Sequence, residues 1–187
     1  TWLIKEWPML TKVLAKGFIG AGLKVGGDVI TETDFTDPDN IAAYGLSVTA
    51  VVFAHLKDYA GLDALKNIVE ILGSGVTAWL VVILYFVMAI WIFITLLEFY
   101  LSTSVTVILL PWGMFSKTAF LTEKALAHVF ASGVRLLVLS TILGSALPVM
   151  YQLNGGMGTG FDAVLRLLCG ALALLLLCWR ANSFAQA

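Results

Sequence analysis

Residues 76–97 read VTAWLVVILYFVMAIWIFITLL, a run without a single charged side chain. A transmembrane helix needs about 20 apolar residues to cross a hydrocarbon core of about 30 Å, so this stretch predicts a membrane span. The whole chain supports the same class of protein. Its 187 residues are 60% hydrophobic and 12% charged, whereas about a quarter of the residues are charged in a soluble domain. We therefore expect an integral membrane protein.

Two further apolar segments follow this run. Residues 136–153 and 164–179 are the second and third predicted spans. Arg166 and Arg180 bound the last of them, and their long side chains can reach the membrane surface from within a helix. The sequence therefore predicts three crossings.

The stretch 99–115 is the least regular part of the apolar region. The segment 99–110 that precedes Pro111 is too short for a straightforward span. Pro111, Trp112 and Gly113 predict a break, because proline ends the helical hydrogen-bond ladder and glycine allows a sharp turn. We expect a helix end and a short re-entrant or interfacial element, with a full second span as the alternative.

The region 1–72 has a different composition, with six lysines and nine acidic residues. In residues 1–18, Lys5, Lys12 and Lys16 share one helical face, and the opposite face is apolar, with Leu3, Trp7, Leu10, Leu14 and Phe18. This pattern is typical of a helix at a membrane interface. A helix packed on its own protein or on a neighbouring subunit fits the pattern equally well.

Two more segments of this region have a helical pattern. Residues 41–56 are uncharged but form a segment that is marginally short for a membrane span, which predicts a buried or re-entrant helix. Residues 62–72 predict a second surface-lying helix. We therefore divide the chain into an acidic, amphipathic helical region, 1–72, and a transmembrane helical domain, 73–187. The expected fold class is an all-α integral membrane protein with transmembrane helices, amphipathic interfacial helices and a re-entrant element broken by Pro and Gly.

The distribution of basic residues predicts the orientation of these segments. Residues 117–135 hold three basic groups and one acidic group, whereas the glycine-rich loop 154–160 holds no charge. Because cytoplasmic segments carry an excess of Lys and Arg, we place 117–135 in the cytoplasm and the loop outside. With three crossings, the region 1–72 is expected outside and the C-terminus inside.

The sequence offers little material for catalysis. His55 and His128 are the two histidines of the chain, and no His/Cys cluster has the spacing of metal ligands. Cys169 and Cys178 lie nine residues apart, so they face opposite sides of one helix and cannot form a disulfide within it. The net charge of −1 provides no basic footprint for duplex nucleic acid. We predict no catalytic, metal-binding or cofactor-binding residue.

Two charged residues stand out within the apolar region. Glu98 separates two long uncharged runs, so it is either a functional carboxylate that faces protein or water, or an acid that marks a helix end. Arg135 is either a pairing partner inside the assembly or an anchor at the cytoplasmic boundary, and we favour the anchor. Small residues at four-residue spacing predict close helix packing; they are Ala127 with Ala131, and Ser140 with Gly144.

A longer motif surrounds the Pro-Trp-Gly break. It consists of Leu109-Leu110-Pro111-Trp112-Gly113, Thr118, Thr122-Glu123-Lys124-Ala125 and Gly133-Val134-Arg135. In this motif, and in the apolar runs that flank it between residues 76 and 150, the chain resembles the TrbL family of conjugative type IV secretion proteins. An aromatic residue after the proline, here Trp112, fits the family pattern.

The resemblance implies a polytopic subunit of a type IV secretion machine in the bacterial inner membrane. It implies a homo-oligomeric ring of sister subunits at the base of the periplasmic stalk or pilus, a pentamer being one option. The other implied partners are a minor pilin or stalk subunit, further inner-membrane components, cytoplasmic ATPases, the lipid bilayer and, transiently, the transferred DNA. The region 1–72 is then periplasmic and the C-terminus cytoplasmic.

The expected function is a non-enzymatic channel or scaffold subunit of conjugative DNA transfer. One alternative is an ion- or solute-conducting channel, or a stator, that uses Glu98. Another is a generic membrane anchor for a soluble partner.

Overall fold

The computed structural model describes residues 2–27, 30–58, 67–115, 117–155 and 161–184. Within these ranges the regular structure is helical and no strand is present. Three segments are long and apolar enough to cross a membrane, namely Ile68–Met114, Ala119–Met150 and Phe161–Ala181. The prediction of an all-α membrane protein is confirmed. The helices are α1 (Trp2–Gly26), α2 (Glu32–Thr36), α3 (Pro38–Asp58), α5 (Ile68–Leu109), the short 3-10 helix η1 (Leu110–Met114), α6 (Ala119–Gly155) and α7 (Phe161–Phe184).

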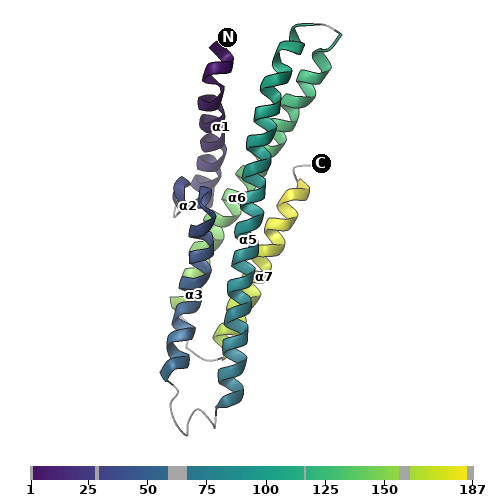
Figure 1. Ribbon diagram of the computed structural model, residues 1–187. Coiled ribbons are helices and arrows are strands. Elements are labelled where there is room, and N and C mark those ends of the chain that lie inside the picture. Colours follow the sequence, from purple (N-terminus) through teal and green to yellow (C-terminus); the bar gives the residue numbers. More distant parts are fainter. Residues whose placement is uncertain (1, 28–29, 59–66, 116, 156–160, 185–187) are drawn as a thin grey trace.

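Helix α5 is the longest element of an elongated bundle (Figure 1). Its 42 residues extend over about 63 Å. Helix α6 returns antiparallel to α5 after η1, and α7 then runs parallel to α5. Trp91 of α5 stacks on Trp179 of α7, with ring centroids 6.4 Å apart. Helices α1 and α3 pack mainly against α6 and α5, respectively.

The stretch 99–109 continues α5 without a break to Leu109, so the expected helix end lies directly before Pro111, and the re-entrant or interfacial element stays a prediction. The Ser and Thr residues of this stretch do not interrupt the helix. The hydroxyls of Thr103, Ser104 and Thr106 each donate to the carbonyl four residues earlier, at 2.8–2.9 Å. These polar side chains are therefore satisfied by their own helix. The predicted break itself lies where α5 ends and η1 begins.

The surface-lying helix expected at 62–72 is also different in the structure. Residues 68–72 form the first turns of α5, and residues 62–66 lie outside the described ranges. The boundary between the two predicted regions, at residue 72, falls within α5. Residues 41–56 belong to α3, which packs along α5.

Helix α1 packs on its own protein, which is one of the interpretations that its amphipathic pattern allows. Its buried face includes Ala15, Ile19 and Leu23. Leu10 and Leu14, on the predicted apolar face, are exposed. Helices can approach each other more closely through small residues than through large ones, and this explains why α1 packs on α6 through the face that carries its small residues.

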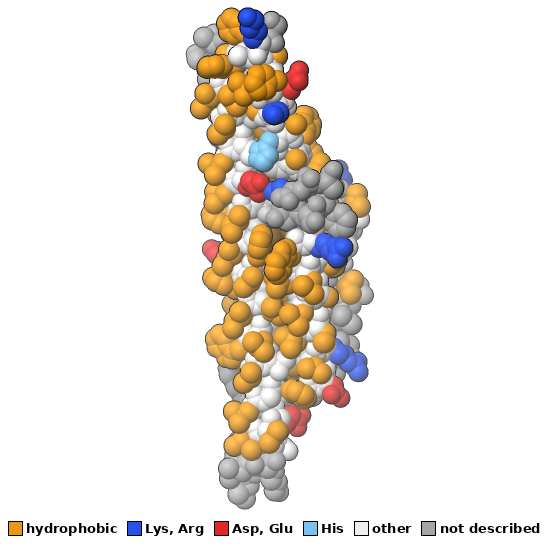
Figure 2. Space-filling model, turned by 90° about the vertical axis from the view of Figure 1, so that its right-hand side faces the viewer, with side chains coloured by type: hydrophobic (Ala, Val, Ile, Leu, Met, Phe, Trp, Pro, Cys, Tyr) orange, Lys and Arg blue, Asp and Glu red, His pale blue; other side chains and the backbone are white. Residues whose placement is uncertain are grey.

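Large apolar side chains cover much of the outer surface (Figure 2). On α5 they include Trp79, Ile83, Phe86 and Ile90. A soluble monomer rarely exposes such extensive apolar surface. This surface therefore contacts either the hydrocarbon of lipid chains or another protein.

Candidate functional site

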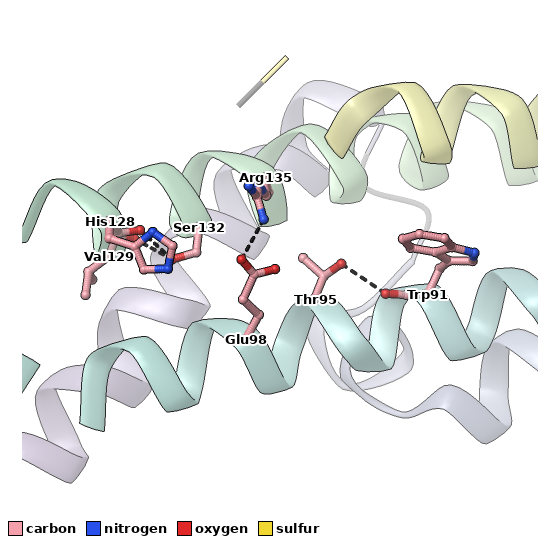
Figure 3. A network of polar contacts seen from close by, with 7 residues as sticks. All are labelled: Trp91, Thr95, Glu98, His128, Val129, Ser132 and Arg135. Carbon is pink, nitrogen blue, oxygen red and sulfur yellow. Dashed lines mark hydrogen bonds and ion pairs between the residues drawn. The ribbon is translucent and has the colours of Figure 1, made fainter. Parts of the chain in front are cut away.

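Glu98 and Arg135 form an ion pair between α5 and α6. Arg135 Nη1 donates to Glu98 Oε1 at 2.6 Å (Figure 3). The antiparallel hairpin of α5 and α6 places the two residues opposite each other, although 37 positions separate them in the sequence. Of the alternatives that the sequence leaves open for Arg135, the geometry corresponds to pairing.

The two side chains of this pair are buried to different extents. The Arg135 side chain is 9% exposed, whereas that of Glu98 is 36% exposed. Arg135 Nε is buried and has no hydrogen-bond partner among the described residues. An unpaired buried charge is costly. The buried Arg135 guanidinium therefore depends on Glu98 more than the partly exposed Glu98 carboxylate depends on Arg135.

Other polar groups lie beside the pair but bond to their own helices (Figure 3). The Ser132 hydroxyl donates to the His128 carbonyl at 2.7 Å, and the Thr95 hydroxyl donates to the Trp91 carbonyl at 2.9 Å. These hydroxyls are satisfied without joining α5 to α6. The ion pair therefore supplies the interhelical polar bond at this level of the hairpin.

The turn around Pro111 is fixed by two threonines that follow it. The Thr122 hydroxyl donates to the Leu109 carbonyl at 2.8 Å, and the Thr118 hydroxyl donates to the Trp112 carbonyl at 2.7 Å. These bonds tie the residues that follow the turn to carbonyls at the end of α5 and in η1, and the Trp112 carbonyl also accepts from the Phe115 N–H at 3.3 Å. Both threonines belong to the motif that carries the family resemblance.

Gly113 is packed closely against the same turn. A Cβ atom added at Gly113 would lie 3.0 Å from Thr122 Oγ1 and 3.2 Å from Thr122 Cβ. A larger side chain at this position therefore displaces Thr122 or the turn.

The tip of the hairpin presents apolar side chains outward. Trp112 and Phe115 are exposed, and Met114 is 87% exposed. A shallow pocket of about 250 Å³ lies here, lined by Pro111, Trp112, Phe115 and Thr118. The tip is about 20 Å from the ion pair along α5, so the structure does not bring the Pro-Trp-Gly break and Glu98 together in one site.

The predicted small residues of α6 lie in two different surroundings. Ser140 and Gly144 are buried against α1, where Gly22 and Gly26 approach them. Ala131 is half-buried and Ala127 is exposed. The contact of Ser140 and Gly144 is therefore within the chain, while Ala127 remains at the surface.

Two features of the α1 contact were missed by the sequence reasoning. One is the packing face of α1 that Gly22 and Gly26 form, which was not expected because glycines in a helical segment predict a weaker helix. The other is the bond from the Trp7 indole nitrogen to the Thr103 carbonyl at 3.0 Å. The four-residue spacing of Gly22 and Gly26 was the available signal for the first, and no sequence signal indicates the second.

The remaining candidates form no chemical site. Cys169 is exposed, Cys178 is buried and neither is in a disulfide. Within the ranges that the structure describes, no three His, Cys, Asp or Glu side chains gather to hold a metal ion. The His55 side chain and the glycine loop 156–160 lie outside what is described.

A bundle with three membrane-competent helices and a charge pair between two of them defines a polytopic α-helical membrane protein. The family model described as TrbL/VirB6 plasmid conjugal transfer protein matches residues 1–181. The chain belongs to this family, and it is thereby a component of conjugal transfer, a type IV secretion process. No curated protein and no solved structure matches the chain significantly.

Proposed function

We propose that the chain is a non-enzymatic scaffold subunit that oligomerises with its sister copies in the inner membrane, at the base of the secretion stalk or pilus. One observation carries this proposal. Large exposed apolar side chains line α5 from Val69, 81% exposed, to Ile108, 70% exposed. The two positions are about 58 Å apart along the helix, roughly twice the thickness of a hydrocarbon core.

A single bilayer therefore leaves about half of this surface without hydrocarbon around it. The part of this surface beyond Glu98, about 15 Å along α5, includes Leu101, Val105 and Ile108 on α5, and Phe120 and Phe130 on α6, all exposed. Protein is the alternative cover for such a surface. Sister copies are the partner we propose, since every copy carries the same surface and closed symmetric rings are common among homo-oligomers.

Further partners follow from membership of the family. A minor pilin or stalk subunit, other inner-membrane components and the ATPases are the proposed neighbours, and transferred DNA is a proposed transient contact. The exposed side chains of Trp112 and Phe115 support a protein contact at the tip of the α5–α6 hairpin. With these partners, the proposed role of the chain is to form a ring that is part of the channel for the transferred substrate.

Crosslinking in native membranes tests the proposal. In a background with Cys169→Ala and Cys178→Ala, Ile108→Cys is treated with a bifunctional maleimide. We expect dimers and higher adducts of the chain. Ile83→Cys is the matched control with few expected adducts, because this exposed position lies in the middle of the predicted span and faces lipid. Exclusively monomeric Ile108→Cys would contradict the proposal.

Conduction of protons or ions through Glu98 is a second candidate function. It is supported by the 36% exposure of the carboxylate in an otherwise apolar helix. Glu98→Gln then abolishes flux in reconstituted vesicles while the complex still assembles. In the scaffold role, any loss of transfer in this variant follows the loss of assembled complex.

The proposed location is the bacterial inner membrane, with the α5–α6 hairpin and the C-terminus in the cytoplasm. The basic residues Lys117, Lys124 and Arg180 support this orientation. The periplasmic placement of residues 1–72, expected from the sequence, is one outcome of the labelling experiment described below.

A further inference from the structure

Helix α3 lies along the part of α5 that is predicted to cross the membrane. A Cβ atom at Gly45 would lie 2.5 Å from Tyr85 Cβ. Toward the C-terminal end of α3, the ring of Phe53 packs edge-on against the ring of Trp79, with ring centroids 6.1 Å apart. The two helices therefore run antiparallel, and Gly45 lies beside the centre of the span 76–97. A helix in contact with the middle of a membrane-crossing helix is itself at membrane depth.

The length of α3 and its uncharged middle suit this position, although α3 is not among the three helices that length and apolar composition alone select. Its 21 residues extend over about 31 Å, which is the thickness of a hydrocarbon core. Residues 41–54 include no charged side chain. Thr49 is fully buried, and its hydroxyl donates to the Gly45 carbonyl at 2.9 Å, so it needs no water.

Helix α1 begins on the hairpin-tip side of the ion pair between Glu98 and Arg135. The Trp7 indole donates to the carbonyl of Thr103, five residues beyond Glu98 toward the hairpin tip. From there α1 runs parallel to α6, and its end, Gly26, meets Gly144. Trp2–Gly26 and Pro38–Asp58 thus form one descending column beside the hairpin (Figure 1). The column begins near the hairpin tip and ends at the opposite end of the bundle.

Charged residues mark two limits of an apolar layer in the bundle. At one end Gly73, three residues after Glu70, faces Phe161, which precedes Asp162. At the other end the Trp91–Trp179 stack is followed by Arg180, and Glu98 lies two turns further along α5. The two contacts are equally far apart on α5 and on α7, at about 27 Å along each helix. The layer matches one bilayer.

From these contacts we propose that α3 is a fourth membrane-crossing helix, and that α1 lies outside the bilayer on the same side as the hairpin tip. The chain then crosses four times, and the N-terminal end of α1, the hairpin tip and the C-terminal end of α7 all face one side. Lys12 and Lys16, both exposed, add to the positive charge of that side, which is the cytoplasm by the distribution of basic residues. The proposal does not depend on oligomerisation.

Single cysteines test this arrangement in the full chain, in a background with Cys169→Ala and Cys178→Ala. Lys12→Cys reports α1, Met114→Cys reports the hairpin tip, and Glu70→Cys and Asp162→Cys report the opposite end. A membrane-impermeant maleimide is applied to cells with a permeabilised outer membrane and, separately, to inverted inner-membrane vesicles. Recovery of detergent-extracted, monodisperse protein is required of each variant before labelling.

We expect Lys12→Cys and Met114→Cys to be labelled from the same side of the membrane, each several-fold more in inverted vesicles than in cells. Glu70→Cys and Asp162→Cys are expected to show the opposite preference. Labelling of Lys12→Cys together with Asp162→Cys, and not with Met114→Cys, would overturn the proposal and support a periplasmic N-terminal region. Labelling of Lys12→Cys from neither side would also overturn it, since α1 would then be in the bilayer.

Discussion

Arg135 Nη1 and Glu98 Oε1 lie 2.6 Å apart and join the two longest helices of the bundle. The contact fixes the register of the hairpin, because a slip of α6 by one residue would turn Arg135 away from Glu98. It also lies where the uncharged run of α5 ends. The pair therefore combines a structural role with a position at the edge of the apolar layer.

Removing either member of this pair has unequal consequences. We predict that Glu98→Gln lowers the free energy of unfolding by about 1–3 kcal/mol, because it leaves the buried Arg135 without compensation. The partial exposure of Glu98 keeps this value below that of a fully buried pair. Arg135→Gln is milder, since water can solvate the remaining carboxylate. Thermal unfolding in detergent measures both variants.

The double variant completes this test. Glu98→Gln with Arg135→Gln is expected to be more stable than the sum of the single losses indicates, because no buried charge then remains unpaired. A greater loss in Arg135→Gln than in Glu98→Gln would show that the carboxylate, and not the guanidinium, depends on the contact.

The glycine face of α1 gives a second prediction. A Cβ atom at Gly22 would clash with the Ser140 hydroxyl and the Leu137 carbonyl, and the backbone of α6 cannot move away cheaply. We predict that Gly22→Ala destabilises the protein by about 1–3 kcal/mol. Helical circular dichroism during heating in detergent measures this change.

Gly17→Ala is the matched control on the same helix. No atom lies within 4 Å of the Cβ position at Gly17. Alanine is the better helix former, so this substitution is expected to stabilise the protein by about 0.5–1 kcal/mol. Equal effects at positions 17 and 22 would argue against close packing of α1 on α6.

The turn at the hairpin tip gives a third prediction. Gly113→Val is expected to impair assembly of the secretion complex, because the β-branched side chain pushes against Thr122 and breaks its bond to the Leu109 carbonyl. The loss of this hydrogen bond alone costs about 1 kcal/mol. Recovery of the complex through an affinity tag on the chain measures the effect.

Met114→Val provides the control for this turn. It introduces the same side chain one position later, where the native residue is almost fully exposed. It should leave assembly unchanged. If Gly113→Val assembles as well as Met114→Val does, the packing of Gly113 on Thr122 has no role in the complex.

The position of the bilayer on α5 gives a fourth prediction. Ile83 and Leu101 are both exposed, and they lie on one face of α5, because a whole number of helical turns, about five, separates them. Ile83→Lys places a charge near the centre of the apolar layer, which disfavours insertion by about 2.5–3.5 kcal/mol. Leu101→Lys lies beyond Glu98 and should insert normally. The fraction of the chain integrated into membranes measures the difference.

The Leu101→Lys variant also reports on oligomerisation. Leu101→Lys should insert but fail to crosslink through Ile108→Cys, because a charge then enters the proposed protein contact. Poor insertion of Leu101→Lys, equal to that of Ile83→Lys, would place the bilayer nearer the hairpin tip.

Much of the fold follows from local sequence. The uncharged runs around Trp91, Leu143 and Leu174 predict three long apolar helices, because length and hydropathy alone decide whether a helix can span hydrocarbon. The continuation of α5 beyond Glu98 was not predictable in this way. The segment before Pro111 is short when counted from Glu98, yet the hydroxyl groups in 102–106 bond to their own helix and α5 continues through them.

The candidate site depends on contacts that are distant in sequence. Glu98 and Arg135 each stand out in the charge pattern, but a single sequence does not reveal the register of two antiparallel helices. The burial of Gly22 in place of Leu14 has a related cause. Periodicity measures hydrophobicity, whereas close contact between helices requires small side chains.

Cryo-electron microscopy of the native complex, extracted in detergent through a tag on this chain, tests most directly whether the protein is an oligomeric scaffold of conjugal transfer. We predict several symmetry-related copies that contact each other through α5 and α6 beyond Glu98, with other secretion components attached. A single copy per complex, or a copy whose Leu101–Ile108 surface is covered only by detergent, would contradict this role.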